Sequence, residues 1–208
     1  LDIFVAIKAG ASIHLVPEEL SVFPRSLAKF IADNEISVWY SVPSALVHMM
    51  VHGDMSRCSF PKLRLLLFAG EVFPTKYLRL LQTIVPHTAL YNLYGPIETN
   101  VCTYYRVGPI PAEQVEPIPI GKLCSNYDVF LLDSDDRRVT ARNTEGEICV
   151  RGSAVAQGYW GDTEKTQEKF TSFTSAEGVR ETFYRTGDLA RLDETGVYRL
   201  VGRKDHMI

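Results

Sequence analysis

The sequence predicts an α/β fold in which a parallel sheet flanked by helices is followed by a small antiparallel, barrel-like unit. In the first half of the chain, short apolar runs alternate with segments whose apolar residues recur every three or four positions. This is the pattern of strands that alternate with amphipathic helices. In the second half, short strand-like runs are separated by turn clusters rich in Asp and Gly, which is typical of antiparallel sheets.

The strands expected in the first half are β-rich apolar runs at residues 11–16, 36–40, 63–68 and 88–93. The helices expected between them cover residues 23–34, 44–52 and 74–84. Pro24 and Pro74 lie near helix starts, where a first-turn proline is tolerated. Because the strands are almost continuously apolar, we expect a parallel sheet that helices cover on both faces.

The pattern changes after Tyr105, where four prolines fall between Pro109 and Pro119 and suggest a linker. Further strands are expected at residues 128–132, 146–151, 189–192 and 197–201, with turns at 133–136 and 193–196. We therefore expect three regions. They are a partial α/β unit at 1–106, a barrel-like unit at 107–202 and a hinge to a missing C-terminal domain at 203–208.

Composition and the two chain ends restrict the class of protein. A net charge of −3 gives no sign of nucleic-acid binding, and no apolar run approaches the roughly 20 residues that span a bilayer. The first residues carry no Met and no signal-peptide pattern, and both ends look cut. The four cysteines form no C-x-x-C pair and are expected to be reduced thiols. These features predict a piece of a cytoplasmic protein.

Candidate binding residues follow two of the expected strands. In open parallel sheets ligands bind at the carboxyl ends of the strands. Small residues after Phe68 would let a flat ligand approach the backbone closely, and the residues there are Ala69-Gly70-Glu71. An aromatic ring, an amide and a carboxylate suited to a base and Mg²⁺ follow the next strand, in Asn92-Leu93-Tyr94-Gly95-Pro96-Ile97-Glu98-Thr99. An ordinary exposed loop would explain any one of them alone.

The second half adds a further carboxylate and a guanidinium group. Asp188 follows a glycine at a turn into a strand, where it could accept hydrogen bonds from ribose hydroxyls. Arg203 is a bidentate donor suited to phosphate or ribose. A plain turn aspartate and a solvated charged turn are the ordinary alternatives. Gly146-Glu147-Ile148-Cys149 and Gly158-Tyr159-Trp160 complete the set of motifs, without a role assigned from the residues themselves.

With these motifs the whole chain resembles the adenylate-forming superfamily of acyl- and aminoacyl-activating enzymes. The family patterns are N-x-Y-G-P-T-E, G-E-(I/L)-C-x-x-G with a later A-x-G-Y, Y-x-T-G-D and G-R-x-D, and they occur here in the family's order and spacing. The resemblance implies ATP and Mg²⁺ as the ligands. It also implies a two-step reaction in which an acid is first activated as its adenylate and then transferred to a thiol.

The resemblance also implies roles for individual residues. The nucleotide-binding positions would be Gly70, Glu71, Asn92, Tyr94, Gly95, Asp188 and Arg203. Glu98 would hold Mg²⁺ and act in catalysis with Thr99, and Asp205 would be the hinge to the family's C-terminal domain. The acyl pocket would be lined at Leu1, Tyr40, Leu67, Ala69, Leu93, Val101 and Cys102.

One residue departs from the family pattern. Ile97 stands where the family has Thr, whose hydroxyl contacts the α-phosphate, and loss of such a donor costs on the order of 100-fold in rate. Thr99 or a water could stand in for that donor. The family's phosphate loop would lie upstream of Leu1 and its catalytic lysine beyond Ile208, so we expect this fragment alone to be inactive.

The expected substrate is an amino acid with an apolar side chain, because no charged residue falls among the acyl-pocket positions. The resemblance is strongest to freestanding ligases that load amino acids onto the phosphopantetheine of a carrier protein. That carrier protein is therefore the expected partner, without nucleic acid or membrane. An acyl-coenzyme A or aryl-acid ligase is one alternative. A non-catalytic nucleotide-binding relative, suggested by Ile97, is another.

Overall fold

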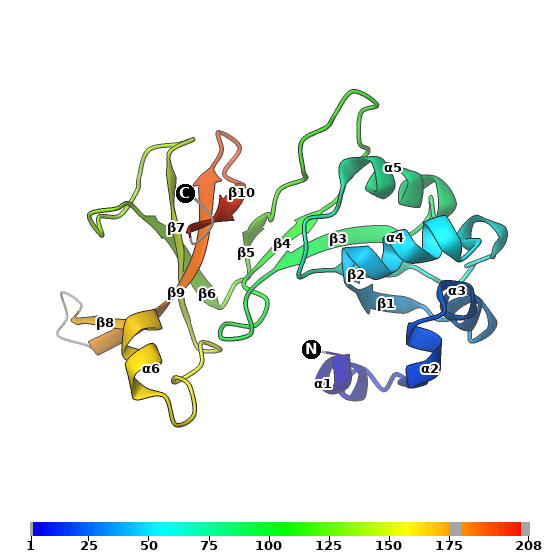
Figure 1. Cartoon of the computed structure of the whole chain (residues 1–208), viewed down its shortest axis with the longest axis horizontal. Helices are drawn as coiled ribbons and strands as arrows, with labels where there is room; N and C mark the ends of the chain where they lie inside the picture. Colours follow the sequence, from blue (N-terminus) through cyan, green and yellow to red (C-terminus); the bar gives the residue numbers. More distant parts are fainter. Residues whose placement is uncertain (1, 175–179, 205–208) are drawn as a thin grey trace.

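The computed structural model describes residues 2–174 and 180–204, which form two five-stranded sheets with helices packed mainly on the first (Figure 1). Sheet A consists of β1 (Val38–Ser41), β2 (Leu65–Phe68), β3 (Ala89–Tyr94), β4 (Thr103–Arg106) and β5 (Lys122–Leu123), in that spatial order. Sheet B is built from later segments. This two-part α/β architecture confirms the fold class predicted from the sequence.

Sheet A is mixed rather than wholly parallel. Strands β1, β2 and β3 are parallel, whereas β4 and β5 run antiparallel to their neighbours. Only residues 95–102 connect β3 to β4, and a parallel crossover needs a dozen or more residues. The short connection therefore reverses the chain direction and keeps the loop at the carboxyl end of β3.

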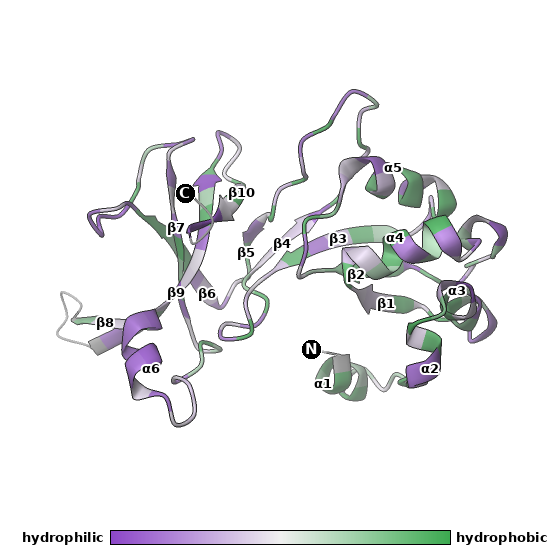
Figure 2. Cartoon of the chain, in the orientation of Figure 1, coloured by the Kyte–Doolittle hydropathy of each residue, from purple (hydrophilic) through white to green (hydrophobic). Residues whose placement is uncertain are grey.

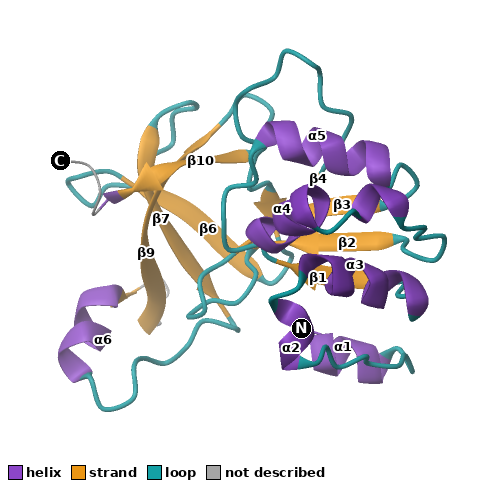
Figure 3. Ribbon diagram, turned by 45° about the vertical axis from the view of Figure 1, so that its right-hand side comes forward, coloured by secondary structure: helices purple, strands orange, loops and turns teal. Residues whose placement is uncertain are grey.

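Three amphipathic helices cover one face of sheet A: α3 (Pro24–Asp33), α4 (Pro43–His52) and α5 (Thr75–Ile84) (Figure 3). Leu66 and Phe68 of β2 point into the resulting core, whereas Leu65 and Leu67 alternate onto the other face and are only partly buried. In the described residues these helices cover one face, not both as the apolar strands had suggested. The alternating burial of β2 is the pattern of a sheet with a single covered face.

The N-terminal segment contains α1 (Asp2–Lys8) and the single turn α2 (Glu18–Ser21). Residues 11–16 were expected to form a strand, and that expectation was wrong, because they have no regular structure and are exposed. An apolar run becomes a strand only where another strand completes its hydrogen bonds, and none lies beside it in the described chain. Figure 2 shows α1 as largely apolar, and Phe4 is 81% exposed.

Sheet B is an antiparallel, curled sheet with the order β10-β9-β7-β6, and β8 pairs with one end of β9. Its strands are β6 (Tyr127–Leu132), β7 (Glu145–Gly152), β8 (Phe170–Thr174), β9 (Arg180–Leu192) and β10 (Tyr198–Arg203). Four of them match expected strands, although β9 is much longer than expected. Strand β8 and helix α6 (Thr163–Lys169) were not expected.

The two sheets meet where Gly121, beside β5, forms a bridge with Tyr198 of β10. The amide N–H of Tyr198 donates to the Gly121 carbonyl oxygen at 2.8 Å, and the Tyr198 hydroxyl donates to the Val129 carbonyl oxygen at 2.7 Å. This seam holds the carboxyl end of β3 opposite β9 and β10. The described residues also include a short 3₁₀ helix (Met55–Arg57), and none of their helices is long and apolar enough to cross a membrane.

Candidate functional site

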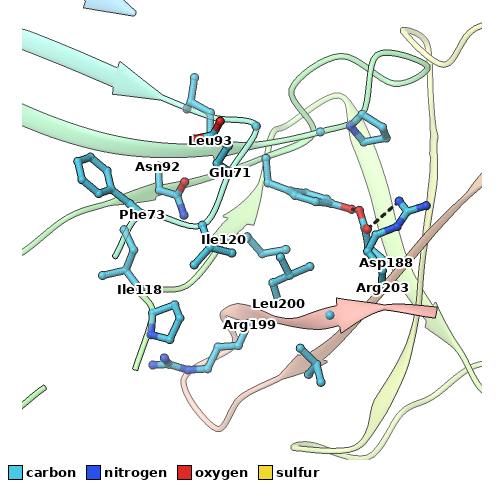
Figure 4. Close-up of a pocket in the computed structure, with 18 of the residues that line it drawn as sticks. Glu71, Phe73, Asn92, Leu93, Ile118, Ile120, Asp188, Arg199, Leu200 and Arg203 are labelled. Atoms are coloured by element: carbon cyan, nitrogen blue, oxygen red, sulfur yellow. Dashed lines mark hydrogen bonds and ion pairs between the residues drawn. The ribbon is translucent and has the colours of Figure 1, made fainter. Parts of the chain in front are cut away.

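A cavity of about 740 Å³ lies between the two sheets (Figure 4). Its walls come from the end of β3, from the segments that follow β2 and β3, from residues 116–120 and from β9 and β10 in sheet B. The fold thus brings together, in one cavity, seven positions that the sequence analysis assigned to nucleotide binding: Gly70, Glu71, Asn92, Tyr94, Gly95, Asp188 and Arg203.

The Asp188 carboxylate is held at the wall of the cavity by two neighbouring side chains. The side chain of Asp188 is 14% exposed, Oδ2 accepts from the Tyr94 hydroxyl at 2.6 Å, and Oδ1 accepts from Nη1 of Arg203 at 3.0 Å. Burial, followed by the negative charge of Asp188, raises the pKa of Tyr94 well above its usual value, so the phenol remains a donor. Each carboxylate oxygen has a second lone pair, which leaves Asp188 able to accept from a ligand.

Asn92 and Gly95 shape the sheet A side of the cavity. The buried Asn92 amide donates from Nδ2 to the Pro119 carbonyl oxygen at 2.8 Å, which fixes the orientation of the carboxamide. At Gly95 a Cβ atom would lie 1.9 Å from the carbonyl oxygen of Asn100. Only glycine therefore lets the loop after β3 fold back on itself beside the cavity.

Glu71 lines the cavity, but both of its carboxylate oxygens accept hydrogen bonds from the first turn of helix α4. Oε2 accepts from the Ser44 amide at 2.8 Å and Oε1 accepts from the Ser44 hydroxyl at 2.9 Å. Ser44 lies in the first turn of α4, where Val42 offers no side-chain cap, so Glu71 satisfies a free amide there. This contact joins residues 27 positions apart, and local sequence patterns give no signal for it.

Ile97 and Thr99 occupy opposite environments in the loop after β3. The Ile97 side chain is 99% exposed at the edge of the cavity. Thr99 is fully buried, and its hydroxyl faces the carbonyl oxygens of Asn100 at 2.9 Å and Pro96 at 3.3 Å. The structure therefore does not bring the Thr99 hydroxyl to the cavity, where it was expected to assist catalysis.

Glu98 lies in the same loop, beside the cavity rather than in its wall. Burial is the largest single influence and disfavours the charge of Glu98. The hydrogen bond from the Tyr159 hydroxyl to Oε1 at 2.6 Å, the neighbouring Tyr184 hydroxyl and the positive charge of Lys165 act together against it and lower the pKa of Glu98 below its usual value. An ionised carboxylate beside a cavity large enough for a nucleotide fits Mg²⁺, which binds through one or two carboxylates and substrate phosphates. In the described chain no group of three or more His, Cys, Asp or Glu could hold a metal without such help.

Five of the seven positions expected to line an acyl pocket divide into two groups. Tyr40, Leu67 and Leu93 lie on the face of sheet A that α3, α4 and α5 leave uncovered, and only Leu93 also lines the cavity. Ala69 and Val101 are partly buried in the loops that follow β2 and β3.

Cys102 is fully buried in the hydrophobic cluster of sheet B and does not open onto the cavity. Burial also raises the pKa of its thiol to about 12. Two predicted site residues cannot be placed, because Leu1 and Asp205 lie outside the described residues.

Glu147, from the G-E-I-C motif, is a buried carboxylate that does not line the cavity. The side chain of Glu147 is 6% exposed and accepts from Nη2 of Arg185 at 2.7 Å, from Nζ of Lys204 at 3.3 Å and from the Gly187 amide at 3.2 Å. These contacts tie β7 to the turn that precedes Asp188 and to the end of β10. The sequence motif gave no role to Glu147, because the residues that it contacts are distant in the sequence.

Comparison with known proteins agrees with this geometry. The model of the family described as AMP-binding enzyme matches residues 1–160. The chain is 43% identical over its full length to an L-proline–[L-prolyl-carrier protein] ligase of Pseudomonas fluorescens and 40% identical to a protein of the same name from Streptomyces coelicolor. It covers 39% and 38% of those two relatives.

Solved structures include close matches to the whole described fold. The structure titled "Crystal structure of IdnL1" superposes with a TM-score of 0.89 at 32% identity, over 97% of this chain and 42% of that chain. The present chain therefore spans about two fifths of the length of the relatives and of the structure that it matches.

Proposed function

Because the chain belongs to the family of AMP-binding enzymes, we propose that it binds ATP between its two sheets and activates an amino acid as the aminoacyl-adenylate. The observation that carries this proposal is the placement of Asp188. Its carboxylate is held by Tyr94 and Arg203 at the wall of a cavity large enough for a nucleotide.

The cavity offers complementary groups to each part of a nucleotide. Asp188 would accept from both ribose hydroxyls, and the fixed amide of Asn92 would face the edge of the base. The small residues Gly70 and Gly95 leave room for a flat ring. Arg203, whose side chain is 47% exposed, would reach ribose or phosphate while it remains paired with Asp188.

The proposed reaction has two steps. The substrate carboxylate attacks the α-phosphorus of ATP and pyrophosphate leaves, and a phosphopantetheine thiol of a carrier protein then attacks the acyl carbon and releases AMP. In-line phosphoryl chemistry of this kind depends on positioning and on charge stabilisation more than on covalent participation by the protein. Mg²⁺ held by Glu98 and the phosphates would supply part of that stabilisation. The names of the two L-prolyl-carrier protein ligases support carrier loading.

The proposed substrate has a small apolar side chain, with L-proline as the first candidate. The uncharged positions Tyr40, Leu67 and Leu93 on the open face of sheet A would tolerate an apolar group, whereas a buried charge there would have no partner. Both L-prolyl-carrier ligases support proline in particular.

Amino-acid-dependent exchange of ³²P-pyrophosphate into ATP tests the proposal in the full-length protein. We expect exchange with L-proline to exceed that with charged amino acids, and Asp188→Ala to abolish it. Exchange with fatty or aryl acids alone would favour an acyl-coenzyme A or aryl-acid ligase. ATP binding without exchange for any acid would favour a non-catalytic relative, for which the missing hydroxyl at Ile97 is the specific argument.

A further inference from the structure

The loop that contains Gly158 and Tyr159 is docked onto Glu98 through both main chain and side chain. The amide of Ala156 donates to the Glu98 carbonyl oxygen at 2.7 Å, and the Tyr159 hydroxyl donates to Glu98 Oε1 at 2.6 Å. The two segments are 61 residues apart in the sequence. This contact gives a role to Tyr159 of the Gly158-Tyr159-Trp160 motif, which nucleotide binding leaves unexplained.

Helix α6 holds Tyr159 in this position. The Tyr159 amide donates to Oγ1 of Thr166 at 2.9 Å, and Thr166 in turn donates to the Asp162 carbonyl oxygen at 2.7 Å. The Tyr159 ring packs edge-on against Phe170 with ring centres 5.6 Å apart, and Nζ of Lys165 lies 4.7 Å above it. The ring is therefore fixed from several sides.

Gly158 makes this arrangement possible. Its φ of +148° is one that other residues rarely adopt, and a Cβ atom there would lie 2.5 Å from Cγ2 of Thr166. Any side chain at residue 158 would push the loop away from α6 and move the Tyr159 hydroxyl with it.

Helix α6 contributes little to the protein core. None of its residues is buried, and Figure 2 shows it as hydrophilic. Its N-terminus is nevertheless capped, since Asp162 accepts from the Lys165 amide at 2.9 Å. Besides its contacts with β8 and β9, this exposed helix therefore holds Tyr159 through Thr166 and Lys165.

We propose that Tyr159 is a positioning residue that orients the Glu98 carboxylate for the divalent metal ion of bound ATP. This inference rests on the proposed function, in which Glu98 is the metal ligand. The hydroxyl of Tyr159 donates to Oε1 and is itself 3.3 Å from the hydroxyl of Tyr184, so the position of Oε1 is restrained while the carboxylate keeps lone pairs for a metal ion. Residues that orient a ligand in this way typically contribute 10- to 100-fold to metal affinity.

Mn²⁺ replaces Mg²⁺ as the probe, because its affinity for the full-length protein in complex with ATP is measured directly by electron paramagnetic resonance. We expect Tyr159→Phe to weaken Mn²⁺ binding about 10-fold and to leave metal-free ATP affinity unchanged. Gly158→Ala should also weaken Mn²⁺ binding, because it would displace the Tyr159 hydroxyl although the tyrosine itself is retained. Tyr77→Phe, which removes a hydroxyl on α5 far from this loop, is the matched control and should bind Mn²⁺ normally.

Glu98→Gln tests the metal-binding role of Glu98 separately from the positioning role of Tyr159. If Glu98→Gln weakens Mn²⁺ binding and Tyr159→Phe does not, the positioning role is overturned and the metal role of Glu98 stands. If neither variant affects Mn²⁺ binding, both roles are wrong, while pyrophosphate exchange still decides separately whether the protein adenylates an acid. A variant that loses metal-free ATP affinity or melts early would show general damage to the site and would also count against the inference.

Discussion

Asp188 and Arg203 lie opposite each other on the antiparallel strands β9 and β10, and their carboxylate and guanidinium groups are 3.0 Å apart. The register of one strand pair thus places the proposed ribose acceptor and the proposed phosphate donor side by side. The Arg203 guanidinium also donates to the Thr186 carbonyl oxygen at 3.2 Å, so it is oriented before any ligand arrives. Such preorganisation lowers the entropic cost of binding.

Asp188→Ala should weaken ATP binding to the full-length protein by about 2–4 kcal/mol, because two ribose hydroxyls lose a charged acceptor in a closed site. Isothermal titration calorimetry measures this. Asp135→Ala, which removes an exposed carboxylate paired with Arg137, is the control and should leave affinity unchanged. Parent-like affinity of Asp188→Ala would show that the nucleotide binds elsewhere.

Ile97→Thr should raise the adenylation rate about 10- to 100-fold by restoring a donor toward the α-phosphate. Since Ile97 is 99% exposed, the replacement should cost no packing energy, and the melting temperature should stay the same. Ile97→Val, which has a similar shape but no hydroxyl, is the control for pyrophosphate exchange. An equal rate for both variants would mean that another group already supplies this contact.

Asp193 should make the stability of the chain depend on pH. Burial opposes its charge, but hydrogen bonds from Thr195 and Arg199 lower its pKa to about 2. Because the folded pKa is below the unfolded value, the stabilisation is complete above about pH 4 and disappears as pH falls toward 2. Asp193→Asn should therefore lose about 2 kcal/mol of unfolding free energy at pH 7 and much less near pH 2.5.

Urea unfolding at the two pH values measures this difference. Asp135→Asn, at an exposed site, is the matched control and should unfold like the parent at both. An Asp193→Asn variant that lost the same free energy at both pH values would contradict the electrostatic explanation.

Arg185→Ala should destabilise the fold by about 3 kcal/mol, because it leaves the buried Glu147 carboxylate without its main partner. Replacement of both residues, as Glu147→Leu with Arg185→Met, should cost less than the single change, since no buried charge then remains. Urea unfolding of the two variants gives the comparison. A double variant less stable than Arg185→Ala would show that the pair contributes more than charge compensation.

The elements that could be predicted from the sequence are those in which the spacing of apolar residues matches the side chains that are buried. The helices α3, α4 and α5 and the strands β2, β3, β6 and β7 were located closely because each buries apolar side chains that stand out in the sequence. Helix α6 has no apolar face and escaped prediction. Residues 11–16 have an apolar pattern but no neighbouring strand, so the pattern misled there.

The site was predictable to the extent that its residues fall in motifs. The resemblance assigned Asn92, Tyr94, Asp188 and Arg203 to nucleotide binding, and in the structure all four line one cavity. The contacts between Glu71 and Ser44 and between Tyr159 and Glu98 depend on how loops from distant elements fold against each other. The spacing of residues along the chain does not predict these contacts. The burial of Thr99 was not predicted for the same reason.

The cavity has one wall on each sheet, so its occupant would act as a thermodynamic link between two folding units. A nucleotide that binds only when both walls are in place stabilises their association by RT ln(1 + [L]/Kd), about 2.7 kcal/mol at 100 times Kd. Unfolding of sheet A and of sheet B should then become a single cooperative transition as nucleotide concentration rises. In this protein a small molecule would contribute to unfolding cooperativity, a property usually attributed to the polypeptide alone.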